Sequence, residues 1–421
     1  MTLRSFHRRS LILLALVSVA CTPDDGDDTP VVERTTVGDT TIVRTVSGSV
    51  WGDTARLVEE VRIGALDGPE ETTFGSVDQV VPRRDGGVDV FDSQAFALRR
   101  YDSTGAFVKQ IGRRGQGPGE YEQIIGMRAL SDGRLAAYDG RNTRITTYSP
   151  NGDPATTWPL QLSVRVFSDN AFAVDRTDHM YVQTQRPRQT QGPSSDGIML
   201  RFGPDGTITD TLEIPRWPAS AQTQGVCLGP SGRWAMHPSG QLLSGYTNTY
   251  SIDLRQPAGK VLRMQRTATP VAFESGERAE LEDDIARSGP PIESMSISQG
   301  KAPVIQYGPR QTVPQTKPIF RNLVAGLDGR IWVQLHTRAV KINPDSMTVR
   351  PACSVDRKGD PPKISWREPI LWDVFEEDGD YLGVVAVPPR TSLRAMDGDR
   401  VWAVQRGDSD EEYVVRYRIA R

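Results

Sequence analysis

The sequence predicts an all-β chain of the six-bladed β-propeller class, and a repeated turn is the first observation behind that prediction. A tight turn built on Asp-Gly or a similar pair recurs six times, each time between a short strand and an apolar or aromatic one. The six turns lie at Asp85-Gly86, Asp132-Gly133, Asp178-His179, Ser239-Gly240, Asp328-Gly329 and Gly398-Asp399. Gly and Asp accept the positive φ of a tight hairpin, so this pattern is a strong hairpin signal. Six copies of one unit indicate a repeat architecture.

The strand count supplies the second observation. Five of the predicted units, or blades, have four strands, whereas the last has only three before Arg421. An unpaired strand over Leu57–Gly64 precedes the first blade. We expect this strand to complete the last blade, because joining the two ends of the chain in one sheet closes the ring and protects its edges. A two-sheet sandwich does not account for six two-turn units.

Composition limits the classes of partner. The 421 residues include 24% charged and 37% hydrophobic residues, which is typical of a globular chain, and the net charge is −3. A nucleic-acid-binding surface needs clustered Lys and Arg, and the sequence shows no such cluster. We therefore expect no nucleic-acid partner.

The first residues predict export. Residues 1–21 combine a basic start, an apolar run over Leu11–Val19 that is too short to span a bilayer, and a small residue before Cys21. This pattern resembles a bacterial lipoprotein signal, which implies lipidation of Cys21, and the following Thr22 favours the outer membrane. The predicted location is therefore the cell envelope, facing the periplasm or the surface. Ordinary secretion with cleavage after Ala20 is the alternative.

The chain divides into three predicted regions. Residues 1–21 are the signal peptide, and residues 22–39, which are rich in Asp and poor in apolar residues, are predicted to form a flexible tether. Residues 40–421 form the propeller. An insertion at 268–319 separates blades four and five and is predicted to contain a helix from Glu274 to Arg287.

A family resemblance supports the fold. The segment Ile111–Tyr121, with the sequence IGRRGQGPGEY, resembles the Gly-rich link between blades of NHL-type six-bladed propellers. Bacterial lipoproteins with such a propeller are often of unknown function. The resemblance covers about residues 50–421 and implies the fold, whereas propellers host many unrelated activities.

The long insertions are expected on one face of the ring. Residues 112–121, 184–197, 268–319 and 336–366 all connect strand ends opposite the tight turns. Binding residues commonly lie on loops over a rigid scaffold, so this loop-rich face is the predicted binding face. The helix in the insertion is either a lid over the central channel or a surface helix packed on the rim.

The first strands of the blades supply candidate ligand-binding residues for the channel. These candidates are Asp78, Gln79, Arg128, Trp234, Asn322 and Arg394. Arg128 and Arg394 favour an anionic ligand through bidentate hydrogen bonds, and with Trp234 they suit a sugar acid or a peptide carboxylate. The alternative is that both arginines pair with neighbouring acids.

No metal site and no catalytic residue is assigned. Propeller enzymes of the gluconolactonase or amidating-lyase type hold a divalent cation between convergent carboxylate or His ligands. His179, His237 and His336 are not expected to converge. A Ca²⁺ site using Asp78 and Asp175 remains open, although each carboxylate also suits a turn.

Two cysteines, Cys227 and Cys353, lie in the predicted propeller. In an oxidising compartment they form either a disulfide or two buried thiols, because sequence does not give the separation that a bridge requires.

These features favour one function over another. The leading hypothesis is an exported, lipid-anchored module that binds a protein or a small molecule on its loop-rich face, with the membrane as a second partner. The alternative is a metal-dependent enzyme similar to a lactonase or a lyase.

Overall fold

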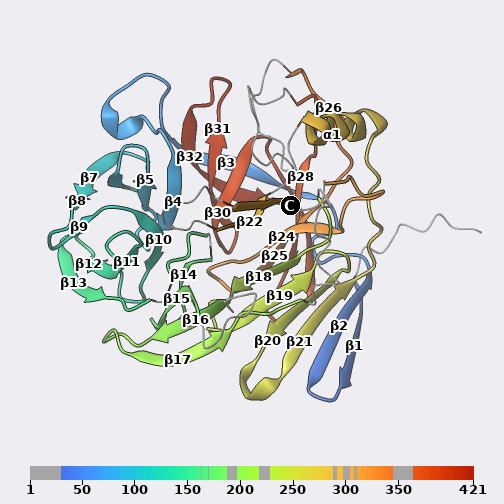
Figure 1. Cartoon of the computed structure of the whole chain (residues 1–421), viewed down its shortest axis with the longest axis horizontal. Coiled ribbons are helices and arrows are strands. Elements are labelled where there is room, and N and C mark those ends of the chain that lie inside the picture. Colours follow the sequence, from blue (N-terminus) through green and yellow to red (C-terminus); the bar gives the residue numbers. More distant parts are fainter. Residues whose placement is uncertain are drawn as a thin grey trace, which may run out of the picture.

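The β-strands of the computed structural model form sheets arranged around a common centre (Figure 1). The structure describes residues 30–162, 164–168, 170–186, 197–217, 228–287, 292–296, 304–307, 311–344 and 364–421. In these residues α1 (Ser275–Arg287) is the one α-helix, which confirms the all-β prediction and the helix expected in the insertion. No helix in this part of the chain is long and apolar enough to cross a membrane.

Three consecutive sheets have four antiparallel strands each. The first contains β4 (Val77–Pro82), β5 (Val88–Asp92), β6 (Ala97–Tyr101) and β7 (Phe107–Ile111). The second contains β10 (Ile124–Ala129), β11 (Leu135–Asp139), β12 (Arg144–Tyr148) and β13 (Pro154–Pro159). The third contains β14 (Phe172–Val174), β15 (Met180–Gln185), β16 (Gly197–Phe202) and β17 (Ile208–Glu213). In each sheet the strands are paired in sequence order, as tight hairpin turns require.

The fourth sheet has six strands, because a hairpin near the N-terminus joins it. Its own strands are β18 (Gly232–Met236), β19 (Leu242–Tyr246), β20 (Ser251–Arg255) and β21 (Val261–Arg266), and the added strands are β1 (Val31–Val37) and β2 (Thr40–Ser47). β2 runs parallel to β21. The flexible tether predicted over residues 22–39 is therefore wrong for its second half. The β-branched residues of β1 favour a strand, and Gly38, with a φ of +57°, makes the turn into β2.

The last sheet has eight strands. One half contains β24 (Phe320–Ala325), β25 (Ile331–Leu335), β28 (Ile370–Phe375) and β29 (Tyr381–Val387). The other half contains β30 (Thr391–Asp397), β31 (Arg400–Arg406), β32 (Glu412–Ala420) and β3 (Ala55–Ile63). β3 pairs antiparallel with β32 from Arg56 to Ile63, so a strand from near the N-terminus lies beside the C-terminal strand. The two halves are joined where β3 meets β29 over two parallel pairs.

Short elements complete the described chain. The small pairs are β8 (Arg113–Arg114) with β9 (Glu120–Tyr121), β22 (Ile292–Ser296) with β23 (Val304–Tyr307), and β26 (Val340–Lys341) with β27 (Trp366–Arg367). Two 3-10 helices are η1 (Glu70–Thr72) and η3 (Pro257–Gly259). β8 and β9 belong to the Gly-rich link, where a Cβ on Gly112 would meet the Gly119 carbonyl oxygen at 2.5 Å. The glycines of this link therefore allow a close crossing of the backbone.

The hydrophobic core lies between neighbouring sheets. Phe91 and Leu98 of the first sheet are buried with Met127 of the second. Across the eight-stranded sheet, Trp332 and Trp372 are buried in one cluster with strands β31 and β32. Each sheet therefore buries its inward-facing side chains against the next, as the packing of radial blades requires.

Contacts between tight turns tie the sheets together on the face opposite the insertions. The backbone N–H of Ser131 donates to the carboxylate of Asp178 at 2.7 Å. Arg176 donates to the carbonyl of Asp328 at 2.6 Å, and the Asp328 carboxylate accepts the N–H of Gly398 at 3.0 Å. On the tight-turn face, these contacts connect the second repeat with the third, the third with the fifth, and the fifth with the sixth.

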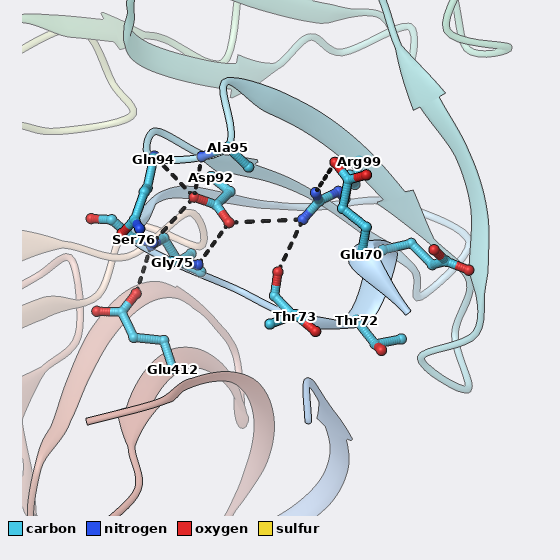
Figure 2. A network of polar contacts seen from close by, with 12 residues as sticks. Glu70, Thr72, Thr73, Gly75, Ser76, Asp92, Gln94, Ala95, Arg99 and Glu412 are labelled. Carbon is cyan, nitrogen blue, oxygen red and sulfur yellow. Dashed lines mark hydrogen bonds and ion pairs between the residues drawn. The ribbon is translucent and has the colours of Figure 1, made fainter. Parts of the chain in front are cut away.

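On the loop-rich face, a buried carboxylate holds the strand ends of the first sheet. Figure 2 shows Asp92, at the end of β5, surrounded by backbone N–H groups. Asp92 accepts hydrogen bonds from the N–H groups of Gly75, Ser76, Gln94 and Ala95 at 2.9–3.1 Å. One carboxylate therefore satisfies donors from both the entry to β4 and the β5–β6 turn.

The second sheet repeats this arrangement, but the later sheets do not. Asp139 pairs with Ile124 in the same way that Asp92 pairs with Val77, and it accepts backbone N–H groups from both neighbouring segments. In the fourth, fifth and sixth repeats the same register position is held by Tyr246, Leu335 and Gln405. None of these three side chains carries a carboxylate, so those strand ends are held differently.

We predict that Asp92→Ala lowers the free energy of unfolding by about 3 kcal/mol, because it leaves four backbone N–H groups without their acceptor. Chemical denaturation monitored by circular dichroism measures the change. Asp102→Ala is the matched control, because Asp102 also accepts backbone N–H groups but lies in an exposed turn. An equal loss in both variants contradicts the role given to the buried carboxylate.

Candidate functional site

A pocket of about 980 Å³ opens on the loop-rich face. Its walls come from the beginnings of β18, β24 and β30, the ends of β25 and β31, the segment around β27, and α1. In an antiparallel sheet, the beginning of a first strand and the end of a second strand lie at the same edge, opposite the tight turn that joins them. The pocket is therefore at the edge where the insertions at 268–319 and 336–366 were expected to lie.

Helix α1 forms one wall of the pocket and is fixed there by contacts with two segments. A Cβ on Gly276 would lie 2.6 Å from the ring of Trp366, so the helix packs directly on that indole. Glu280 accepts the backbone N–H of Ser365 at 3.1 Å. Arg278 donates to the carbonyl of Val313 at 3.0 Å. The structure thus places α1 beside the pocket, and Glu277, Glu280 and Leu281 contribute to its lining.

A buried lysine connects α1 with the floor of the pocket. The Lys317 ammonium group is fully buried and lies 2.8 Å from a Glu277 oxygen and 3.1 Å from a Glu368 oxygen. It also donates to the carbonyl of Thr337 at 3.1 Å. Two carboxylates and a carbonyl offset the cost of burying the ammonium group. Because Glu277 belongs to α1 and Glu368 precedes β28, the lysine fixes the helix to the sheet.

Glu368 is the centre of this network. Its carboxylate contacts Nδ1 of His336 at 3.1 Å and accepts the backbone N–H of Thr337 at 2.9 Å. Burial raises the pKa of Glu368, but the hydrogen bond with His336, the charges of Arg321 and His336 and the N–H of Thr337 outweigh burial and hold this pKa at about 2. Glu368 is therefore ionised at neutral pH.

Three arginines of the lining stand out because of their partners. Arg233 donates from Nε to the carbonyl of Arg321 at 2.8 Å. Arg321 lies 3.6 Å from Glu368, which it shares with Lys317. Burial lowers the pKa of Arg233 and Arg321 lowers it further, while burial and the charge of Arg390 lower the pKa of Arg367. A neighbouring arginine therefore contributes to the lowered pKa of both Arg233 and Arg367.

None of the six predicted channel residues lines this pocket. Gln79 donates to the carbonyl of Ile125 on β10, and Arg394 donates to the carbonyl of Val77, so both connect neighbouring first strands. The Asn322 side chain accepts the N–H of Leu323. The assignment of these residues to a ligand in the channel stays a prediction.

The remaining three channel candidates also have defined positions. Asp78 is exposed and lies within hydrogen-bond distance of the Ser76 hydroxyl, at 3.4 Å. Arg128 donates to the carbonyl of Met127 at 2.7 Å. Trp234 is half-buried and packs against the cluster that contains Tyr181.

The pocket residues that sequence reasoning missed lie next to predicted ones. Arg233 precedes Trp234 and Arg321 precedes Asn322, and successive side chains of a strand point to opposite faces. Pairing in β24 shifts between Phe320 and Asn322, which changes the alternation at that point. The sequence gives the residue types, but it does not give the face of the strand to which each side chain points.

The metal-ligand candidates have separate partners. Asp175 accepts two backbone N–H groups of its own turn and the Tyr181 hydroxyl, as a turn former does. His237 donates from Nε2 to the carbonyl of Gly329, whereas His336 contacts Glu368. Within the described residues, no group of three or more His, Cys, Asp and Glu side chains is arranged to hold a metal ion. The predicted lipidation site Cys21 and the possible disulfide partners Cys227 and Cys353 lie outside those residues.

Comparisons with known proteins agree with the fold. A family model described as a 6-bladed β-propeller matches residues 42–200. A solved member of the DUF4221 family from Bacteroides vulgatus superposes with a TM-score of 0.52 at 10% identity, covering 87% of this chain and 99% of that one. With the radial arrangement of the sheets, these similarities identify the class of protein as a six-bladed β-propeller.

Other similarities are more distant. A putative exported protein from Bacteroides fragilis gives a TM-score of 0.48 at 10% identity over 90% of this chain and 100% of that one. A gluconolactonase from Xanthomonas campestris gives 0.37 at 11% identity over 86% and 99%. The human protein turtle homolog A is 26% identical over 203 residues, which is 48% of this chain. The chain spans only 16% of the length of that curated relative.

We predict that Glu368→Gln lowers the free energy of unfolding at pH 7 by up to about 3 kcal/mol, because the pKa of Glu368 falls from an ordinary 4.5 to about 2 on folding. A lowered pKa stabilises the fold above about pH 4.5, and this contribution is lost as the pH falls toward 2. Denaturation curves should therefore show that the difference in the free energy of unfolding between wild type and variant becomes smaller as the pH falls from about 4.5 toward 2. Glu70→Gln, which removes an exposed carboxylate, is the control and should change the free energy of unfolding by less than about 1 kcal/mol.

Proposed function

We propose that this chain is an exported, lipid-anchored six-bladed β-propeller that binds a ligand in the pocket on its loop-rich face. One observation carries the proposal, namely a pocket of about 980 Å³ between the strand ends and α1. Its volume is at the upper end of the range of small-molecule sites, about 300–1,000 Å³. Its lining combines apolar residues such as Trp366, Phe320 and Ile370 with a few charged groups, as ligand sites do.

The construction of the pocket supports a preformed site. Lys317 and Glu368 are buried and connect α1 to the sheet through several charge-assisted contacts. Side chains held by packing and hydrogen bonds lose little conformational freedom when a ligand binds. The pocket is therefore suited to binding without a large rearrangement.

The ring itself is part of the proposal. In a six-bladed ring, the eight-stranded sheet corresponds to two blades, which contact each other at the short parallel pairing of β29 with β3. β3 completes the last blade by pairing with β32, and this pairing closes the ring. Closure holds the strand ends around the pocket at fixed positions.

The proposed location rests on the N-terminal segment. The segment before Cys21 resembles a lipoprotein signal. The metal-dependent lactonase or lyase remains the alternative from the sequence. Metal content of the dialysed protein separates it from a binding module, because a bound equivalent of Ca²⁺ would move the site to a metal centre.

We predict that the neutral apolar dye N-phenyl-1-naphthylamine binds the wild type saturably, at about one molecule per chain, and that Ser392→Trp abolishes this binding. Ser392 is an exposed residue of the lining, so a tryptophan there fills the pocket with little effect on the core. Fluorescence titration measures binding. Thr156→Trp on the outer strand β13 is the control and should bind as the wild type does. Unchanged binding in Ser392→Trp contradicts a site in this pocket.

We predict that Cys21→Ala moves the protein from the membrane fraction to the soluble fraction of the envelope, because it removes the site of lipidation. Immunoblotting after fractionation, with metabolic labelling by a fatty acid, measures the change. Thr22→Ala is the matched control and should leave labelling intact. Labelling of Cys21→Ala at the wild-type level contradicts the lipid anchor.

A further inference from the structure

The acids of the pocket lining already have partners within the protein. Glu277 and Glu368 both contact Lys317. Asp283 pairs with Arg287, and Asp410 pairs with Arg390. The fifth acid of the lining, Glu280, accepts the backbone N–H of Ser365.

Two arginines of the lining have no acidic partner among the described residues. The hydrogen bonds of the Arg233 guanidinium go to backbone carbonyls, those of Arg321 and Gly232. Arg367 has neither a side-chain hydrogen bond nor an ion pair in the described part of the chain. Arg321 lies between these two arginines in the network of contacts. Its backbone carbonyl accepts a hydrogen bond from Arg233, and its guanidinium group lies 3.6 Å from Glu368, which follows Arg367 in the sequence.

A partly buried guanidinium without a counter-ion favours an anion. Arg presents a planar set of donors that matches a carboxylate or a similar oxyanion, and this match is strengthened where water is excluded. Another part of the lining supplies apolar surface from Trp366, Ile342 and Leu281. Because Arg233 and Arg367 line the same cavity as these apolar side chains, the same ligand should contact both groups.

We propose that the pocket binds an apolar molecule that carries a single carboxylate or a similar oxyanion, and that Arg233 and Arg367 bind the anionic group. This inference rests on the proposed function and specifies its ligand class. It moves the anion-binding role that the sequence suggested for Arg128 and Arg394 to a different pair of arginines. The apolar part of the ligand lies against Trp366 and the isoleucines of the lining.

Two dyes that differ by one charged group test the proposal. 1-Anilinonaphthalene-8-sulfonate carries a sulfonate, whereas N-phenyl-1-naphthylamine has the same ring system without it. The wild type should bind the sulfonate dye at least about tenfold more tightly than the neutral dye. A charge-assisted hydrogen bond contributes enough free energy for such a difference in affinity. Arg233→Gln and Arg367→Gln should each lower the affinity for the sulfonate dye about tenfold and should leave the affinity for the neutral dye unchanged. Arg394→Gln is the control outside the pocket and should change neither affinity.

Salt dependence provides a measurement that does not rely on variants. Added NaCl should weaken binding of the sulfonate to the wild type and should leave binding of the neutral dye unchanged. The proposal is overturned if both dyes bind equally well, or if the two arginine variants keep the wild-type preference. In either case the neutral dye still reports a working pocket, so the proposed function stands. If neither dye binds the wild type, the proposed function and this inference fail together.

Discussion

The structure depends on how the strand ends of the loop-rich face satisfy their backbone N–H groups, because buried donors without acceptors are costly. In the first two sheets, Asp92 and Asp139 each accept hydrogen bonds from several backbone N–H groups at these strand ends. In the later repeats other groups take this role. The Thr247 hydroxyl accepts the N–H of Ser231, and Glu368 accepts the N–H of Thr337. Glu368 follows the insertion at 336–366 and also lines the pocket, so the group that holds this strand end belongs to the site as well.

The two faces of the ring therefore have different tasks. On the tight-turn face, contacts such as Ser131 with Asp178 connect successive repeats and leave short turns exposed. On the other face, the insertions supply α1, the segment around Trp366 and the buried Lys317, which together enclose the pocket. A rigid ring with one elaborated face is a common way to combine a stable scaffold with variable binding residues. Among the arginines that line the pocket, Arg233 and Arg367 have no acidic partner in the described part of the chain.

Local patterns predicted the fold well, whereas the site needed information that one sequence does not contain. The Asp-Gly turns, the strand near Leu57 and the helix ending at Arg287 are determined by neighbouring residues, and each is present in the structure. The N-terminal hairpin was missed because β1 is mostly exposed and so lacks the alternation of a half-buried strand. The site was missed for two reasons. The choice between Arg233 and Trp234 depends on which face of the strand is inward, and the partners of Lys317 lie far away in the chain.

We propose that the ligand lies in the pocket beside α1 and not in the channel lined by the first strands. Photo-crosslinking distinguishes the two positions, with p-benzoylphenylalanine in place of Trp366 in the pocket or of Arg128 on the first strand β10. The protein would be irradiated in its native envelope and its mass measured after purification. A ligand in the pocket predicts a discrete small-molecule adduct at position 366 and none at position 128. An adduct at position 128 with none at 366 would contradict the claim and return the site to the channel.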